Sequence, residues 1–286
     1  MLTKVKKVNK PKKTVKKASK KLDFVKLSKG KKKGPVKLST KNSVTYVALV
    51  VDRSGSMASI YAAALDGVNE QINTLKQSAK DLNLKTFVTV IQFDEHIETL
   101  YSQKDALELE PFKHGDFYPR GTTAMRDGVY KAIQDLESIT NAPDDVGYLV
   151  VVISDGLENA SREITQEALA TKAKQLQDTG KWTFTYMLAN QDITAVSRAL
   201  NIPLNNVSSF VATNAGVAAA YTTTSGASAG YMSLRSSGVT SSQDFYNKGT
   251  TTIPTVNTTA TVILDPNAAA TVATLKTKKL KVQQVK

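Results

Sequence analysis

The feature that most constrains the fold is a continuous apolar run at residues 46–51 that ends in three polar side chains, Asp52, Ser54 and Ser56. Such a run is typical of a strand buried on both faces of a parallel sheet. From residue 60 to residue 82, apolar side chains recur every three or four positions, as in an amphipathic helix. The polar cluster therefore lies where a strand ends and a helix begins. Open α/β sheets bind their ligands at this place.

These three side chains offer only oxygen atoms. Carboxylate and hydroxyl oxygens suit a small hard cation such as Mg²⁺. The chain contains no cysteine, which excludes a disulfide framework and a thiolate metal site and is compatible with a reducing compartment. Two isolated histidines, His96 and His114, make a zinc site improbable.

Apolar strand patterns and helical patterns alternate along the rest of the chain. We expect strands at 44–51, 86–93, 97–101, 147–153, 182–188 and 207–211. We expect helices at 60–82, after residue 123, and at 165–179, 193–200 and 213–236. The fold class predicted is α/β, with a doubly wound, mostly parallel sheet and helices on both faces. The strand at 97–101 follows a tight turn, so it is expected as one antiparallel edge strand.

Three segments resemble the von Willebrand factor type A family. The run Asp52-Arg-Ser54-Gly-Ser56 is similar to the Asp-x-Ser-x-Ser signature of its metal-ion-dependent adhesion site. Residues 120–125 resemble the second loop of that site, and the strand that ends in Asp155-Gly156 resembles the third. The likeness covers roughly residues 44–210, and each loop has the expected strand or helix beside it.

The resemblance implies a site for one Mg²⁺ or Mn²⁺ ion at the rim of the domain. Ser54 and Ser56 would bind the ion directly, and Thr123 directly or through water. Asp52 and Asp155 would act mostly through water molecules. One position would stay open for an acidic side chain of a protein partner. We assign Thr123 rather than Thr122 because it directly precedes Ala124-Met125.

Simpler interpretations of the same residues exist. Ser54 is suited to capping the helix that follows it, and Thr122 to capping the helix after residue 123. Asp127, in a first helical turn, is expected to be a surface acid favoured by the helix dipole. Glu158 and Asn159 lie near the same rim in sequence and are weaker candidates for shaping it.

An enzyme is not expected. Ser54 and Ser56 lack the Gly-x-Ser-x-Gly surroundings of an activated serine, and no base is evident beside them. The Lys-Gly runs at 29–34 lack the spacing of a phosphate-binding loop.

The chain is divided by charge as well as by pattern. Residues 1–43 contain seventeen lysines and one acid, Asp23, and are expected to form a disordered tail. Within this tail, residues 22–27 interrupt the lysine-rich pattern with apolar side chains. This segment is too short to form a core but long enough to dock on another surface. We expect a domain at 44–211, a helical extension packed on it at 212–248, and a low-complexity tail with a basic end at 249–286.

Two functions are compatible with these features. The first is a non-catalytic, metal-dependent protein-binding module whose basic tail binds nucleic acid or another polyanion without sequence preference. The alternative is a nucleic-acid-associated assembly protein, in which the domain is mainly a scaffold. Residues 213–236, together with Asn190-Gln191-Asp192, resemble the C-terminal part of a branch of the family encoded by bacteria and bacteriophages, so a phage particle is one setting. An anionic membrane surface is another possible target of the tail.

A cytoplasmic location is expected, in the host cytoplasm or in a virion if a phage encodes the chain. No apolar run approaches the length of a membrane span, and the first residues lack the apolar segment of a secretory signal.

Overall fold

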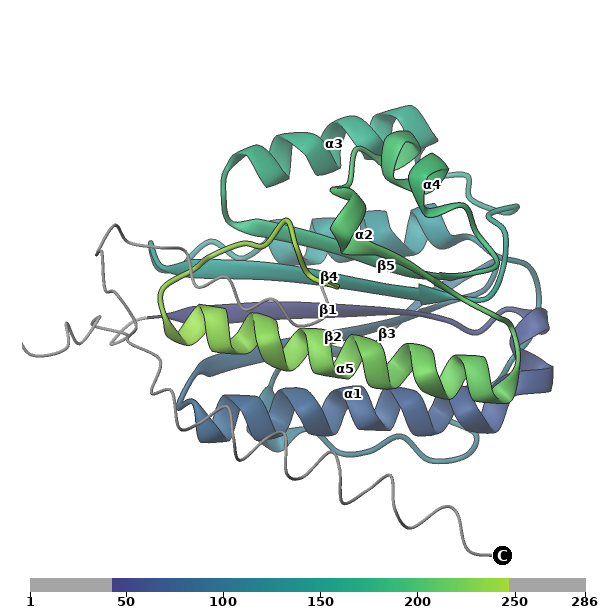
Figure 1. Ribbon diagram of the computed structural model, residues 1–286, viewed down its shortest axis with the longest axis horizontal. Coiled ribbons are helices and arrows are strands. Elements are labelled where there is room, and N and C mark those ends of the chain that lie inside the picture. Colours follow the sequence, from purple (N-terminus) through teal and green to yellow (C-terminus); the bar gives the residue numbers. More distant parts are fainter. Residues whose placement is uncertain (1–42, 247–286) are drawn as a thin grey trace, which may run out of the picture. The chain divides into compact units, whose positions relative to one another are not determined.

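A computed structural model describes residues 43–246 (Figure 1). The predicted tails at 1–43 and 249–286 lie outside these residues, apart from Ser43. No helix within the described residues is both long and apolar enough to cross a membrane.

The described chain forms one six-stranded sheet in the order β3-β2-β1-β4-β5-β6. Its strands are β1 (Val44–Asp52), β2 (Lys85–Phe93), β3 (Ile97–Asp105), β4 (Val146–Ser154), β5 (Trp182–Ala189) and β6 (Val207–Phe210). Only the pair of β2 and β3 is antiparallel, and the other pairs are parallel. The predicted mixed sheet with one antiparallel edge strand is confirmed.

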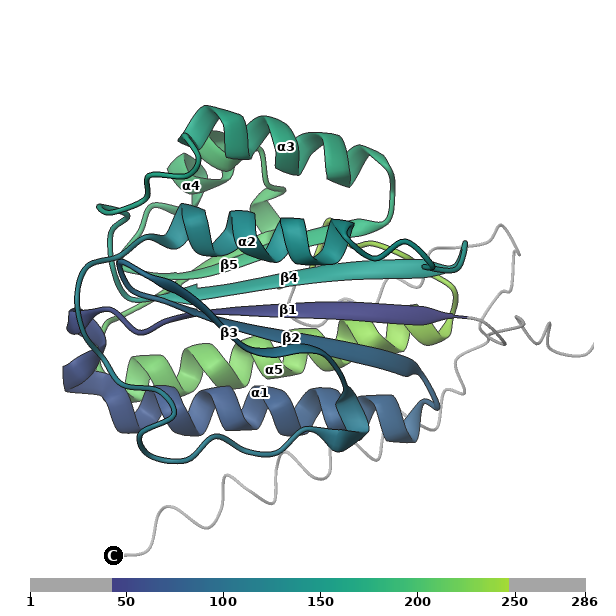
Figure 2. The same ribbon diagram turned by 180° about the vertical axis from the view of Figure 1, so that it is seen from behind.

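Helices cover both faces of the sheet, as predicted (Figures 1 and 2). They are α1 (Tyr61–Asp81), α2 (Met125–Glu137), α3 (Gln166–Asp178), α4 (Ile193–Leu200) and α5 (Asn214–Ser236), with short 3₁₀ turns η1 (Gly55–Ile60), η2 (Ala106–Glu108) and η3 (Leu204–Asn206). Helices α1 and α5 share one apolar core, and α2, α3 and α4 contribute to the other. Alternate side chains of β1 enter the two cores, with Val47 and Leu49 in one and Ala48 and Val50 in the other. This explains its uninterrupted apolar sequence.

Two predicted boundaries differ from the structure by several residues, and others differ by one. The helix predicted from residue 60 is preceded by η1, so helical structure begins directly after Ser54. The strand predicted at 97–101 continues to Asp105 as β3. The missed residues are polar and face solvent on an edge strand, and Gln103 has a left-handed φ of 47° beside a register shift, so no regular alternation marks them.

Helix α5 packs closely along α1. A side chain at Gly67 of α1 would place its Cβ 2.2 Å from ring atoms of Tyr221, so only glycine allows this approach. Buried Gln71 bonds to two serines of α5: it accepts from Ser225 Oγ at 2.9 Å and donates to Ser228. The small residues of α5 therefore form a close and partly polar contact. The division into a domain at 44–211 and an extension at 212–248 stays a prediction.

Arg235 joins the end of α5 to the start of β1. Its side chain is fully buried, and its guanidinium donates to Asp145 Oδ1 at 3.0 Å and to Ser43 Oγ at 3.0 Å. It also donates to the carbonyl oxygens of Val44 and Asp145 and to Thr45 Oγ1. Gly147 leaves space for this group, because a Cβ there would lie 2.8 Å from Arg235 Nε.

Replacing Arg235 should destabilise the whole domain. We expect Arg235→Met to lower the free energy of unfolding by about 3 kcal/mol, because several buried acceptors would lose their donor. Urea denaturation measures this change. Arg198→Met, on the exposed surface of α4, is the matched control and should change it by less than about 0.5 kcal/mol. An equal midpoint for the two variants would contradict the assigned role.

Candidate metal site at the carboxyl edge of the sheet

The three predicted loops meet at one edge of the sheet. β1 and β4 are parallel neighbours with Val51 opposite Ile153, so Asp52 and Ser154 end at the same level. The N–H of Gly55 donates to the carbonyl of Gly121 at 3.1 Å, and the N–H of Arg120 donates to the carbonyl of Arg53 at 2.8 Å. The first and second loops are therefore tied together by backbone hydrogen bonds.

Four of the five predicted ligands form a chain of short contacts. The backbone N–H of Ser54 donates to Asp52 Oδ1 at 2.7 Å. The hydroxyl oxygens of Ser54 and Ser56 lie 3.1 Å apart, and Ser56 Oγ donates to Asp155 Oδ1 at 2.7 Å. Residues 99 positions apart in sequence thus share one polar cluster.

Thr123 reaches the same cluster beside Gly156. A Cβ on Gly156 would lie 2.9 Å from Thr123 Oγ1 and 3.5 Å from Asp52 Oδ2. The Thr123 hydroxyl and the Asp52 carboxylate therefore flank one glycine, and a side chain there would collide with the hydroxyl. All five predicted residues are brought together.

The cluster is deeper than a rim site. Asp52, Ser54 and Thr123 are 0%, 1% and 4% exposed, whereas Ser56 is exposed and Asp155 is half-buried. Three of the five side chains are therefore enclosed, although they stand at the edge of the sheet. Their burial follows from the loops, which close over the ends of β1 and β4.

Burial also shifts the two carboxyl groups. It raises the pKa of Asp52 to about 6, although hydrogen bonds from Ser154 and Ser54 act in the opposite direction. The negative charge of nearby Asp155 raises it further. Burial likewise raises the pKa of Asp155, against the hydrogen bond from Ser56. A cation between the two groups would favour their charged forms.

The arginines nearest the cluster are directed elsewhere. Arg120 Nε donates to Asp94 Oδ2 at 2.7 Å, and Arg53 Nε forms an ion pair with the same oxygen at 2.9 Å without the alignment of a hydrogen bond. Arg53 also binds Glu98 at 2.7 Å. The two acids and the histidine of the turn at 94–96 lie close enough to suggest a second metal site, but Asp94 already has two guanidinium partners. We assign this turn a structural role.

The loop after β4 is held by an acid of α2 that was expected to face solvent. Asp127 is buried and accepts from the backbone N–H groups of Arg162, Glu163 and Ile164, so its interpretation as a surface acid is wrong. Its partners lie 35 to 37 residues away, and no local pattern marks them.

Thr122 does not cap α2, contrary to expectation. The Ncap position is Ala124, without a side-chain cap, and the N–H of Thr122 donates to Glu95. The first amides of α2 are satisfied from the third loop instead, since Arg126 N–H donates to Glu158 Oε2 at 2.9 Å. Asn159 Oδ1 accepts from Thr123 N–H at 2.9 Å. Both weaker candidates thus hold the second loop in place.

Capping by the Ser54 hydroxyl is also absent. Ser54 occupies the Ncap position of η1 but makes no side-chain cap, because its hydroxyl faces Ser56.

Sequence analysis missed Ser154 and gave no role to Gly156. Ser154 Oγ donates to Asp52 Oδ2, which makes this hydroxyl the closest support of the buried carboxylate. One signal in the sequence could have indicated this role. Ser154 is a hydroxyl residue at the last position of an apolar strand, directly before the predicted ligand Asp155.

The donor set fits a small divalent cation. It consists of three hydroxyls and two carboxylates, all oxygen, on loops fixed by backbone hydrogen bonds. Both carboxyl groups have raised pKa values, so each would be stabilised by positive charge. The residues that would hold the ion are Ser54, Ser56 and Thr123, with Asp52 and Asp155 in support. The bound ion would supply a positive centre for an acidic group.

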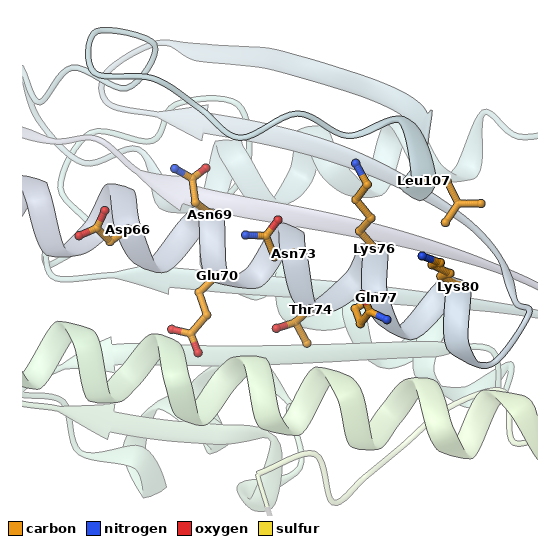
Figure 3. A pocket seen from close by; sticks show the side chains of 9 residues that line it. All are labelled: Asp66, Asn69, Glu70, Asn73, Thr74, Lys76, Gln77, Lys80 and Leu107. Carbon is orange, nitrogen blue, oxygen red and sulfur yellow. The ribbon is translucent and has the colours of Figure 1, made fainter.

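A surface depression lies away from this cluster. An open depression of about 970 Å³ runs along the outer surface of α1 (Figure 3). It is lined by acids such as Asp66 and Glu70 and by lysines such as Lys76 and Lys80. None of the five predicted ligands lines it.

Comparison with known proteins agrees with the geometry. The family model described as the von Willebrand factor type A domain matches residues 47–221. No curated protein matches the chain.

Several solved structures are similar to the chain at low identity. One is von Willebrand factor type A from Catenulispora acidiphila, at 15% identity and a TM-score of 0.44, covering 69% of this chain and 43% of that one. Another is the pilus adhesin SpaC from Lactobacillus rhamnosus GG, at 14% identity and a TM-score of 0.49, covering 66% of this chain and 30% of that one. A third is the vWF domain of the type V pili tip protein Mfa5 from Porphyromonas gingivalis, at 15% identity and a TM-score of 0.48, covering 69% of this chain and 97% of that one. The chain thus spans less than half of the first two proteins.

Because the Asp52 carboxyl group is buried, removing its charge should raise the free energy of unfolding by an amount that depends on pH. Because the folded pKa of Asp52 is raised to about 6, its ionisation costs stability as pH rises from about 4 to 6. Asp52→Asn cannot ionise, so in EDTA it should be more stable than the wild type above pH 6, by up to about 3 kcal/mol. The advantage should shrink toward pH 4.

Urea denaturation at several pH values measures this difference. Asp66→Asn, on the exposed side of α1, is the control and should show no such trend. Equal midpoints for Asp52→Asn and the wild type at pH 7.5 would contradict the prediction.

Proposed function

The chain belongs to the von Willebrand factor type A domain family, and on this premise we propose that it is a divalent-cation-dependent protein-binding module. Domains of this family are commonly protein-interaction modules. The observation that carries the proposal is the convergence of five oxygen-bearing side chains from three loops on one cluster. The proposed cation is Mg²⁺ or Mn²⁺.

The partner is proposed to present a carboxylate to the cation. Ser54, Ser56 and Thr123 are neutral, so a cation held by their hydroxyls keeps much of its charge. Ser56 and Asp155 are the ligands that solvent reaches, so the open position would lie on their side of the cluster. An acidic side chain of another protein would complete the coordination there.

The proposal includes no catalysis. A nucleophilic serine needs a group that takes its proton. The hydrogen-bond partners of the Ser56 hydroxyl are Ser54 and the carboxylate of Asp155. A carboxylate beside a divalent cation is a poor base, so this arrangement favours binding over reaction.

A second candidate function rests on the distribution of charge. Residues 43–246 carry 15 basic and 23 acidic side chains, whereas residues 1–42 carry 17 lysines and one acid. A basic tail on an acidic domain would bind nucleic acid, or another polyanion, through phosphate neutralisation. Lysine without arginine argues against base-specific contacts. An assembly role, a phage origin, and a location in the host cytoplasm or a virion stay predictions.

Removing the hydroxyls should weaken cation binding. We expect the double variant Ser54→Ala with Ser56→Ala to lose about 10- to 100-fold in Mg²⁺ and Mn²⁺ affinity by titration calorimetry. Ser59→Ala is the matched control, because Ser59 is exposed on the same turn and contacts only a backbone oxygen at 3.5 Å. Unchanged affinity for both ions in the double variant would refute the site. A partner that stays bound in chelator and to the double variant would place recognition elsewhere.

Deleting residues 1–42 should remove nucleic-acid binding. For the full chain, log affinity should fall with log salt with a slope of about 0.7–0.9 per phosphate neutralised. The deletion stops before Ser43, which is buried and bonded to Arg235. Fluorescence anisotropy with labelled single-stranded DNA measures the affinity of the full chain and of the shortened chain. A deleted chain that keeps the parent's affinity and slope would show that the tail does not bind.

A further inference from the structure

Helix α1 presents charged side chains to solvent in two separate groups. The acids Asp66 and Glu70 stand in its first half, and Lys76 and Lys80 stand in its second half. All four line the open depression along this helix, and eight of the nine residues that line it belong to α1 (Figure 3). The outer face of α1 is therefore a polar surface with an acidic half and a basic half.

This separation of charge is unfavourable within the helix itself. Asp66 and Glu70 are four positions apart, as are Lys76 and Lys80, and like charges at this spacing destabilise a helix. Helices α2 and α3 instead each join a lysine to an aspartate at the same spacing. None of the four α1 side chains forms an ion pair with another described residue. Glu70 accepts from a threonine hydroxyl and Lys76 donates to a backbone carbonyl, and neither partner is charged.

The helix dipole does not account for the order of these charges. Its effect falls off within the first and last turns of a helix. Asp66 and Glu70 are the sixth and tenth residues of α1, and Lys76 is the sixth from its end, so only Lys80 lies in a terminal turn. The four charges therefore fit a partner outside the fold better than the helix that carries them.

We propose that this face of α1 pairs with the same face of a second copy of the chain, with the two helices antiparallel about a two-fold axis at Asn73. Residues 66 and 80 are each seven positions from Asn73, and residues 70 and 76 are each three positions from it. The axis thus brings Asp66 level with Lys80 of the second copy, and Glu70 level with its Lys76. Such a contact is self-complementary, as two-fold interfaces require.

The centre of the contact suits the same symmetry. Asn73 is exposed at the midpoint of the charged face. An amide side chain both donates and accepts hydrogen bonds, so it can pair with its own copy across the axis. A parallel pairing would instead place acids beside acids, and a polyanion would meet the acidic half. The pattern of charge therefore favours an antiparallel second copy over these occupants.

The proposed dimer is weak and sensitive to salt. The face from Asp66 to Lys80 is roughly 20 Å long, so the contact involves little more than one helix from each copy. An interface of this size is typical of transient association. Exposed ion pairs are screened by salt, which adds to this sensitivity.

Dimerisation would leave both candidate cation sites accessible. None of the five proposed ligands lines the depression. Because α1 follows the loop that carries Ser54 and Ser56, antiparallel pairing would put the two sites at opposite ends of the paired helices. A dimer could then hold a repetitive partner at two points, which raises the overall affinity. The pairing itself requires no cation.

Sedimentation velocity of the full chain, treated with nuclease, tests the pairing. Over about a hundredfold range of protein concentration at low salt, the average sedimentation coefficient should rise with concentration. Asp66→Lys and Lys80→Glu should each raise the dimer dissociation constant about tenfold or more, because the two-fold axis makes every change create two like-charge contacts. Glu163→Lys and Arg198→Glu are matched controls on exposed positions outside α1 and should leave it unchanged.

Mixing the two α1 variants supplies the decisive measurement. Asp66→Lys mixed with Lys80→Glu should form a heterodimer of wild-type strength, because each face then meets opposite charge at both ends. The double variant Asp66→Lys with Lys80→Glu should likewise dimerise with itself. These rescues also show that the substituted chains are folded.

Three results would overturn the inference. One is a wild-type chain that stays monomeric over the whole concentration range. Another is association that survives both single variants unchanged, which would place the contact elsewhere, as in the basic tail. The third is weakened association that neither the mixture nor the double variant restores, which would exclude antiparallel pairing of α1.

Discussion

The parallel pairing of β1 with β2 on one side and β4 on the other determines where every part of the site lies. Because all three strands run in the same direction, Asp52, Phe93 and Ser154 end at one edge. The loops that carry Ser54 and Asp155 start there, and the turn after β2 holds the loop of Thr123, since the N–H of Ala124 donates to the carbonyl of Asp94 at 2.8 Å. Backbone hydrogen bonds then lock the loops, as between Arg53 N–H and the carbonyl of Phe93 at 2.8 Å. The site is thus a consequence of strand order, and its ligands come from segments far apart in sequence.

The electrostatics of this edge follow from which charges have partners within it. Arg53 follows Asp52 in the chain, yet its guanidinium pairs with Asp94 and Glu98, and Arg120 also pairs with Asp94. Asp52 and Asp155 are instead supported by serine hydroxyls and a backbone N–H. Neutral donors reduce the cost of a buried carboxylate without cancelling its charge. The fold therefore keeps two negative groups together whose charge an external cation can neutralise.

Periodicity predicted the elements well because their apolar faces are long, as in β1 and α1. The convergence of the five proposed ligands was predictable because motif and strand context coincide at Asp52, Ser54, Ser56, Thr123 and Asp155. The contacts that support these five side chains could not be predicted from the sequence. They depend on which strands pair and which loops meet in the folded chain. Ser154 acquires its role only when β4 pairs beside β1, and the Asp127 carboxylate accepts from a backbone N–H that lies 35 residues away in sequence. Glu158 replaces the expected cap of α2 for the same reason.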